Sequence, residues 1–324
     1  MQETLLVTPS PHIRDRDSTS KIMWTVFFSL VPVIAGSAFF FGVRALLVTA
    51  TAVAAAVASE AVIQKIMKKP STVLDGSAAV TGILLACVLS ASTPLYIVCL
   101  GSIVAIVVVK QLFGGLGANI WNPALAARAF LQAAYPTAVN SNWPVNRLSD
   151  LVSSAETDAV SGATPLTALK EGAESLPSYM ELFLGTVKGC LGETSALLLL
   201  IGAAILLYRG CINWRMPVVY ILTVALLTWI LPNPASDSGW FTGDALFHVL
   251  AGGLMIGAFF MATDMVTTPL SHRGILVFAA GAGLLTAVIR LYGGYPEGVC
   301  YSILLMNTAT PLIDRFTRPK VFGT

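Results

Sequence analysis

Ten apolar runs, separated by charged residues or by glycine and proline, constrain the fold of this chain more than any other sequence feature. Apolar residues make up 56% of its 324 residues and charged residues only 11%. A chain this apolar throughout is typical of an all-α polytopic membrane protein. The runs predict about ten transmembrane helices, near residues 22–43, 45–64, 75–92, 94–112, 121–135, 193–208, 216–231, 244–263, 274–291 and 298–313.

Two short patterns recur in the two halves. Thr93-Pro94 returns as Thr268-Pro269, and Phe113-Gly114-Gly115 returns as Tyr292-Gly293-Gly294. With an odd number of helices in each half, the second copy is upside down, as in many transporters. We therefore predict two inverted five-helix repeats with a polar insert between them. The predicted segments are a cytoplasmic N-terminal segment (1–21), a first repeat (22–136), the insert (137–192), a second repeat (193–313) and a cytoplasmic tail (314–324).

Positive charges predict the orientation of these helices, because cytoplasmic loops are enriched in Lys and Arg. Of the 19 cations, 13 fall in the loops that lie on the same side as the polar N-terminus. We therefore expect both termini in the cytoplasm and the insert on the extracytoplasmic face of the cell membrane. The 13 are Arg14, Arg16, Lys21, Lys65, Lys68, Lys69, Lys110, Arg209, Arg215, Arg273, Arg315, Arg318 and Lys320.

Charge and cysteine content argue against several functions. A net charge of +2 with no dense basic patch gives no reason to expect nucleic-acid binding. The five cysteines are far apart and include no C-x-x-C pair, so the chain encodes neither a zinc site nor a self-contained iron–sulfur cluster locally. There is no glycine fingerprint for a dinucleotide.

The polar insert contains the sequence D-A-V-S-G-A-T, from Asp158 to Thr164. A threonine hydroxyl can form a phosphoester, and Ser161, Gly162 and Ala163 have so little bulk that a modifying enzyme can approach the backbone. The alternative is an ordinary surface turn, because these residue types are common in turns. The additional Asp158 favours attachment of a flavin, since the full pattern arises by chance in on the order of one in several hundred chains of this length. Asp158 either assists the modification or caps a turn.

The residues after Thr164 predict how its side chain is held. Pro165 disfavours helical angles at Thr164, and the run that follows is helix-like. We therefore predict that Thr164 is the N-cap of a short helix over residues 165–173, with Pro165 in its first position. A phosphate on Thr164 would then lie beside unpaired backbone N–H groups.

Six ionisable residues lie within or near the ends of the apolar runs, and such residues often mark functional sites. Arg128 is a candidate for orienting a flavin, or for closing a helix end. His248 and Asp264 are ion-pathway candidates, although a histidine on an apolar helix is usually a packing residue. For Lys110, Asp264 and Arg290, the interpretation we favour is snorkelling to the interface or pairing with a backbone carbonyl. Glu60 is the sixth.

Four motifs resemble one family of membrane proteins, which includes the D subunit of the Rnf ion-translocating electron-transport complex and the B subunit of the sodium-translocating NADH:quinone reductase. The resemblance extends over nearly the whole chain and is closer to the Rnf protein, because its quinone reductase counterpart usually has a longer N-terminal region. The motifs are S-P-H-I (Ser10 to Ile13), N-P-A-L-A-A-R (Asn122 to Arg128), D-A-V-S-G-A-T-P (Asp158 to Pro165) and F-M-A-T-D (Phe260 to Asp264).

The resemblance implies covalent FMN on Thr164, installed by an exported flavin transferase, and a second, noncovalent riboflavin that no motif here locates. It implies an electron-relay subunit that moves electrons between ferredoxin and NAD with its partner subunits in the Rnf complex, while Na⁺ or H⁺ crosses the lipid membrane. Such a subunit is part of an oxidoreductase and is not catalytically complete alone. Three alternatives stay open, namely a subunit of a quinone reductase, a passive inverted-repeat channel and a structural membrane anchor.

Overall fold

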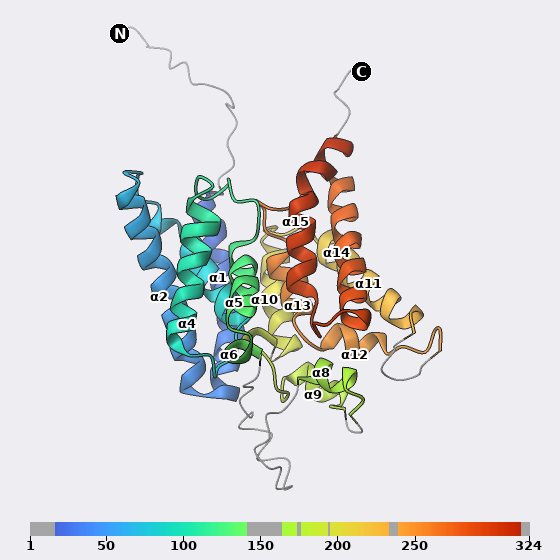
Figure 1. Cartoon of the computed structure of the whole chain (residues 1–324). Coiled ribbons are helices and arrows are strands. Elements are labelled where there is room, and N and C mark those ends of the chain that lie inside the picture. The colour runs from blue at the N-terminus through green and yellow to red at the C-terminus, as the bar shows by residue number, and fades with distance from the viewer. Residues whose placement is uncertain (1–16, 141–163, 174–175, 194, 233–238, 319–324) are drawn as a thin grey trace, which may run out of the picture.

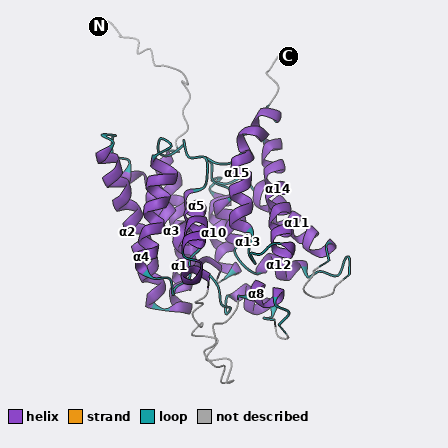
Figure 2. Cartoon of the chain, viewed as in Figure 1, coloured by secondary structure: helices purple, strands orange, loops and turns teal. Residues whose placement is uncertain are grey.

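The computed structural model describes residues 17–140, 164–173, 176–193, 195–232 and 239–318. Every regular element in these ranges is a helix (Figure 2). In chain order they are α1 (Thr19–Phe41), α2 (Val43–Ile66), η1 (Val73–Asp75), α3 (Ser77–Cys87), α4 (Leu95–Ile103), η2 (Val104–Gln111), α5 (Pro123–Ala134), α6 (Pro136–Asn140), α8 (Pro165–Lys170), α9 (Tyr179–Leu184), η3 (Leu191–Glu193), α10 (Ala196–Tyr208), α11 (Arg215–Ile230), α12 (Ala245–Leu250), α13 (Leu254–Ile256), η4 (Gly257–Met261), α14 (His272–Tyr292) and α15 (Val299–Phe316).

A helix or a group of helices lies at each of the ten predicted positions. The third is shorter than predicted, ending at Cys87, and the eighth is broken into α12, α13 and η4. The break falls at Gly252, whose φ of 70° is a left-handed conformation that ends a helix. The fifth, α5, begins as expected with Asn122 as its N-cap and Pro123 in its first turn.

Within the described ranges, three helices are long and apolar enough to cross a membrane by length and composition, namely α1, α2 and α14. Further apolar helices of 10 to 17 residues accompany them. Two stretches, η2 and η4, are π-helical, a local widening that often accompanies functional sites. The expectation of a multi-pass, all-helical membrane protein agrees with these helices.

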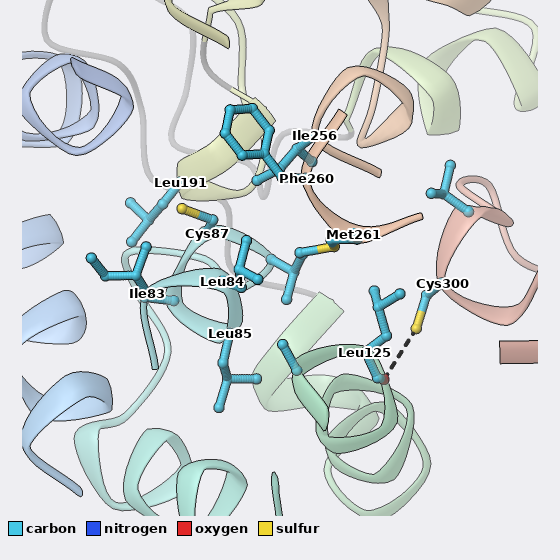
Figure 3. Packing of buried hydrophobic residues seen from close by; sticks show 14 of the residues in the cluster. Ile83, Leu84, Leu85, Cys87, Leu125, Leu191, Ile256, Phe260, Met261 and Cys300 are labelled. Carbon is cyan, nitrogen blue, oxygen red and sulfur yellow. Dashed lines mark hydrogen bonds between the residues drawn. The ribbon is translucent and has the colours of Figure 1, made fainter. Parts of the chain in front are cut away.

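The hydrophobic core lies where elements from the two halves of the sequence meet. Helix α1 packs against α10, and α5 packs against α15. Figure 3 shows Leu84 and Leu125 from the first half beside Phe260 and Met261 from the second. Cys300 in α15 donates a hydrogen bond from its thiol to the carbonyl of Leu125, at 3.3 Å. The two halves therefore form one packed core.

The short helices α8, α9 and α12 gather at one end of the helix bundle, at the bottom of Figure 1, whereas α15 ends at the top. Helix α5 descends toward this lower end and is followed there by α6. Helix α14 also runs down to it, and the loop between α14 and α15 turns there. The lower end therefore brings together the segments that surround Thr164.

Candidate functional site

Thr164 is the N-cap of helix α8, with Pro165 in the first turn, as the sequence predicts. Its backbone is extended (φ −68°, ψ 159°), and its hydroxyl accepts a hydrogen bond from the backbone N–H of Thr167 at 3.3 Å. The two threonine hydroxyls are 2.8 Å apart. The helix ends at Lys170, earlier than predicted. Asp158, Ser161, Gly162 and Ala163 lie outside the described residues, so the rest of the motif stays a prediction.

Thr164 is buried, with 5% of the residue exposed. It lines a cavity of about 300 Å³. Thr164 is therefore largely shielded from solvent, yet it borders a partly open cavity. The other residues lining this cavity are Gln132, Thr167, Gly294, Tyr295, Pro296, Glu297, Gly298, Cys300 and Tyr301.

Two tyrosines form an aromatic wall of this cavity. The rings of Tyr295 and Tyr301 lie 4.9 Å apart, tilted by 33°. Gln132 and Glu297 add polar groups. An apolar space with an aromatic wall and a few polar groups is typical of sites for flat organic cofactors.

Helix α8 is fixed to its neighbours by a small apolar cluster and one polar contact. Leu166 of α8 packs with Leu182 of α9 and with Phe247 and Ala251 of the α12 region. At the other end of α8, the ammonium group of Lys170 donates to the carbonyl of Gly293, which follows α14. These contacts hold the cavity between α8 and the α14–α15 loop.

A hydrogen bond also joins α9 to the start of α12. The hydroxyl of Tyr179 donates to the carboxylate of Asp244 at 2.6 Å. Asp244 in turn caps α12 by accepting from the N–H of Phe247 at 3.0 Å. The hydrogen bond and the negative charge of Asp244 raise the pKa of Tyr179 above its usual value.

A buried charged cluster adjoins the cavity. Arg128 on α5 forms an ion pair with Glu297, in the turn before α15. Its guanidinium also lies 3.7 Å from the sulfur of Cys190. Glu193, Glu297 and Cys190 each place one polar atom within 4.8 Å of the others. Arg128 thus orients Glu297 at the cavity wall, a contact that the sequence did not lead us to expect.

Arg290, on α14, faces the same region but binds backbone carbonyls. Its guanidinium donates to the carbonyl oxygens of His248, Ala251 and Glu297, the last at 2.9 Å. The expectation of pairing with a backbone carbonyl is confirmed for Arg290. The same bonds tie the turn that carries Glu297 to α12 and α14.

The two ion-pathway candidates are not brought together. His248 lies on α12, buried to 4% exposure, and its ring nitrogen Nδ1 has no hydrogen-bond partner. Asp264 follows η4 and accepts hydrogen bonds from the N–H of Val266 and the hydroxyl of Thr267. It lines a different cavity, shared with Lys110. Their roles in ion movement stay predictions.

Lys110 departs from the snorkelling expectation. It is 1% exposed and forms a 2.7 Å ion pair with Glu60 on α2, which is completely buried. Its ammonium group also donates to the hydroxyl of Ser77, and Gln111 donates to Glu60. The expectation was wrong because a partner for Lys110 lies 50 positions away in the sequence.

Sequence reasoning did not single out Glu193 or Glu297 as functional residues. Arg128 and Glu297 are separated by 169 positions, and no local pattern joins them. One signal was available: an arginine inside an apolar helix needs either a carboxylate or backbone carbonyls as partners, and few carboxylates border the apolar runs.

Comparisons with known proteins agree with this picture. The model of the NQR2, RnfD, RnfE family matches residues 6–323. The D subunit of the proton-translocating ferredoxin:NAD(+) oxidoreductase complex of Clostridium ljungdahlii is 49% identical, over 98% of this chain and 96% of that protein. Its counterpart in the Na(+)-translocating complex of Acetobacterium woodii is also 49% identical, over 98% and 95%. The counterpart in the ion-translocating oxidoreductase complex of Stutzerimonas stutzeri is 39% identical, over 95% and 93%. With a match over nearly its whole length, the chain belongs to the NQR2, RnfD, RnfE family.

Proposed function

We propose that the chain is the D subunit of an ion-translocating ferredoxin:NAD⁺ oxidoreductase of the Rnf type, and that it relays electrons through FMN esterified to Thr164. The similarity to the corresponding proteins of two such complexes supports the first part. One observation carries the second: a helix-capping threonine hydroxyl lines a cavity with a tyrosine wall. The chain works as one subunit of an enzyme, with the other Rnf subunits as partners.

The residues around Thr164 fit such a group. Thr164 would hold the phosphate, and the first turn of α8 offers N–H groups beside it, including that of Thr167. Lys188 and Thr164 also line a second, much smaller cavity, so a cation is available near the phosphate. Tyr295, Tyr301 and Gln132 line the space for the ring. When bound, the flavin supplies the electron transfer, and the protein orients it and excludes water.

The packing of the helices supports two inverted repeats. Helix α1 corresponds in order to α10, and α5 to α15, and each of these pairs is in contact. The contact between α2 and α4 in the first half has its counterpart between α11 and α14 in the second. We infer that the repeats span the membrane in opposite senses, with Thr164 on the extracytoplasmic face, where a flavin transferase can act. The noncovalent riboflavin implied by the family has no residues assigned to it.

The transported ion is not decided by overall similarity. The relatives from Clostridium ljungdahlii and Acetobacterium woodii are equally identical to this chain, yet one complex is named for protons and the other for Na⁺. The proposed function therefore includes coupling to either Na⁺ or H⁺. The names of these relatives favour the Rnf type over the quinone reductase type.

Coexpression with a flavin transferase tests the attachment. On a denaturing gel the wild-type chain should give a flavin-fluorescent band at 34.1 kDa, and Thr164→Ala should abolish it. Thr167→Ala is the matched control, because its hydroxyl lies 2.8 Å from that of Thr164, and it should keep the band. A dark wild-type band, or a fluorescent Thr164→Ala band, would contradict the proposal and favour an anchor or a passive channel.

A further inference from the structure

The buried cluster beside the Thr164 cavity contains more acidic groups than its ion pair neutralises. Arg128 and Glu297 form one ion pair, and Glu193 lies close to both. A second buried ion pair joins Lys110 and Glu60 and does not involve this cluster. Glu193 therefore has no cation of its own. Lys188 lines the small cavity with Glu193, but these two residues form no ion pair.

The Glu193 carboxyl group is also short of hydrogen-bond donors. Its oxygen Oε1 has no hydrogen-bond partner, and Oε2 accepts only a long bond, 3.4 Å, from the N–H of Cys190. The residue is 9% exposed. An ionised carboxylate that is buried with so few donors is costly, and the cost falls when the group binds a proton.

The neighbouring elements supply no further donor to Glu193. The guanidinium of Arg290 on α14 is occupied by the three backbone carbonyls. The Nδ1 atom of His248 on α12 has no partner. The thiol of Cys190 donates to the carbonyl of Val88, and that of Cys300 donates to the carbonyl of Leu125. Both arginines keep their positive charge, but neither donates a hydrogen bond to Glu193, and its carboxyl group lies beside that of Glu297. A buried carboxyl group that lacks donors and has a second carboxyl group beside it favours binding of a proton.

We propose that Glu193 and Glu297 form a site that binds one proton, and that this proton is held more tightly when the flavin on Thr164 is reduced. The first part stands on the cluster alone, and the second rests on the proposed function. Only the carboxyl O–H bond is made or broken, and the proton comes from water and returns to it.

The link to the flavin follows from shared cavities. Glu297 lines both the large cavity and the small one, and Thr164 lines both as well. An electron that arrives in the large cavity adds negative charge a short distance from the pair. At a largely buried carboxyl group such a charge is screened less than it is in water, so it favours the protonated form.

Infrared difference spectroscopy of the purified complex tests both parts. In pH-difference spectra we expect a carbonyl band of a protonated carboxyl group in the wild type and in Thr164→Ala, because the site's own residues do not need the flavin. Glu193→Gln should lose this band, and Glu193→Asp should keep it at a shifted position. Glu171→Gln, which changes an exposed acid at the end of α8, should leave it unchanged. In redox-difference spectra the intensity of the band should increase on reduction in the wild type. In Thr164→Ala it should not change on reduction.

Each outcome decides one part. If Glu193→Gln keeps the band, or if Glu193→Asp leaves it unshifted, the proton is elsewhere and the site is wrong. If the redox-linked change persists in Thr164→Ala, its link to this flavin is wrong. Failure of the proposed function is seen separately, as a dark wild-type band on the gel, and the pH-difference spectra then still decide whether the proton site exists.

Discussion

Two buried ion pairs among the described residues differ in the groups that lie beside them. Lys110 and Glu60, in the first half, form a one-to-one pair with almost no exposure. Arg128 and Glu297 form the other pair, and the carboxyl group of Glu193 lies beside them. Glu297 also lines two cavities. A carboxyl group with its own cation, such as Glu60, mainly holds helices together, because changing either charge is costly. A buried carboxyl group without an ion-pair partner, such as Glu193, can bind and release a proton at lower cost. The comparison separates a structural charge from one suited to coupling.

The largest effect is expected from Lys110→Met. It leaves Glu60 buried without a cation, and breaking a buried pair in this way costs about 3–5 kcal/mol. The complex should therefore lose thermal stability, measured as its unfolding midpoint in detergent. The double variant Lys110→Met with Glu60→Gln should recover part of the loss. Lys69→Met, which changes an exposed lysine whose ammonium group donates to the Gly114 carbonyl, is the control. An unchanged midpoint for Lys110→Met would mean that the pair is not structural.

A smaller and pH-dependent effect is expected from Arg128→Met. Loss of the guanidinium leaves two carboxyl groups near one another, and both can be neutralised by protons. The variant should be close to wild type in stability at low pH and fall further below it as the pH rises, since the carboxyl groups then ionise without a cation. Unfolding midpoints measured over a pH series check this. A deficit as large at low pH as at high pH would remove the distinction between the two pairs.

The smallest effect is expected from Gly298→Ala, which disturbs the turn behind Glu297. Gly298 has a φ of 69°, and an added Cβ would lie 3.0 Å from the Cβ of Ile289. The substitution should cost about 1 kcal/mol or more through strain. Gly294→Ala is the matched control in the same loop, because an added Cβ there meets no atom within 4 Å. Equal midpoints for the two variants would show that the turn tolerates a side chain.

The starts of helices could be predicted from the sequence, because they depend on residues that are neighbours in the chain. Thr164-Pro165 and Asn122-Pro123 each contain an N-cap and a first-turn proline, and both start helices as expected. The break within the eighth predicted helix was not foreseen, although Gly252-Gly253 was visible in the sequence. Periodicity and composition therefore give the helices with small errors at their ends.

The charged pairs could not be predicted in the same way, because they are contacts between distant segments. Lys110 and Glu60 are 50 positions apart, and Arg128 and Glu297 are 169 apart. Whether a charge in an apolar helix snorkels or is paired depends on which helix packs beside it, and one sequence does not contain that information. Glu193 was missed for the same reason, since its importance comes only from its neighbours in space.

The burial of Thr164 has a consequence for the order of assembly. Thr164 is 5% exposed and begins a helix that is clamped by Leu166 and Lys170, so another enzyme has little access to its hydroxyl. If Thr164 carries FMN, the transferase must therefore act before α8 docks, or while it is undocked. Flavin attachment then becomes impossible once α8 has docked, and a chain that folds before it meets the transferase would remain without its cofactor.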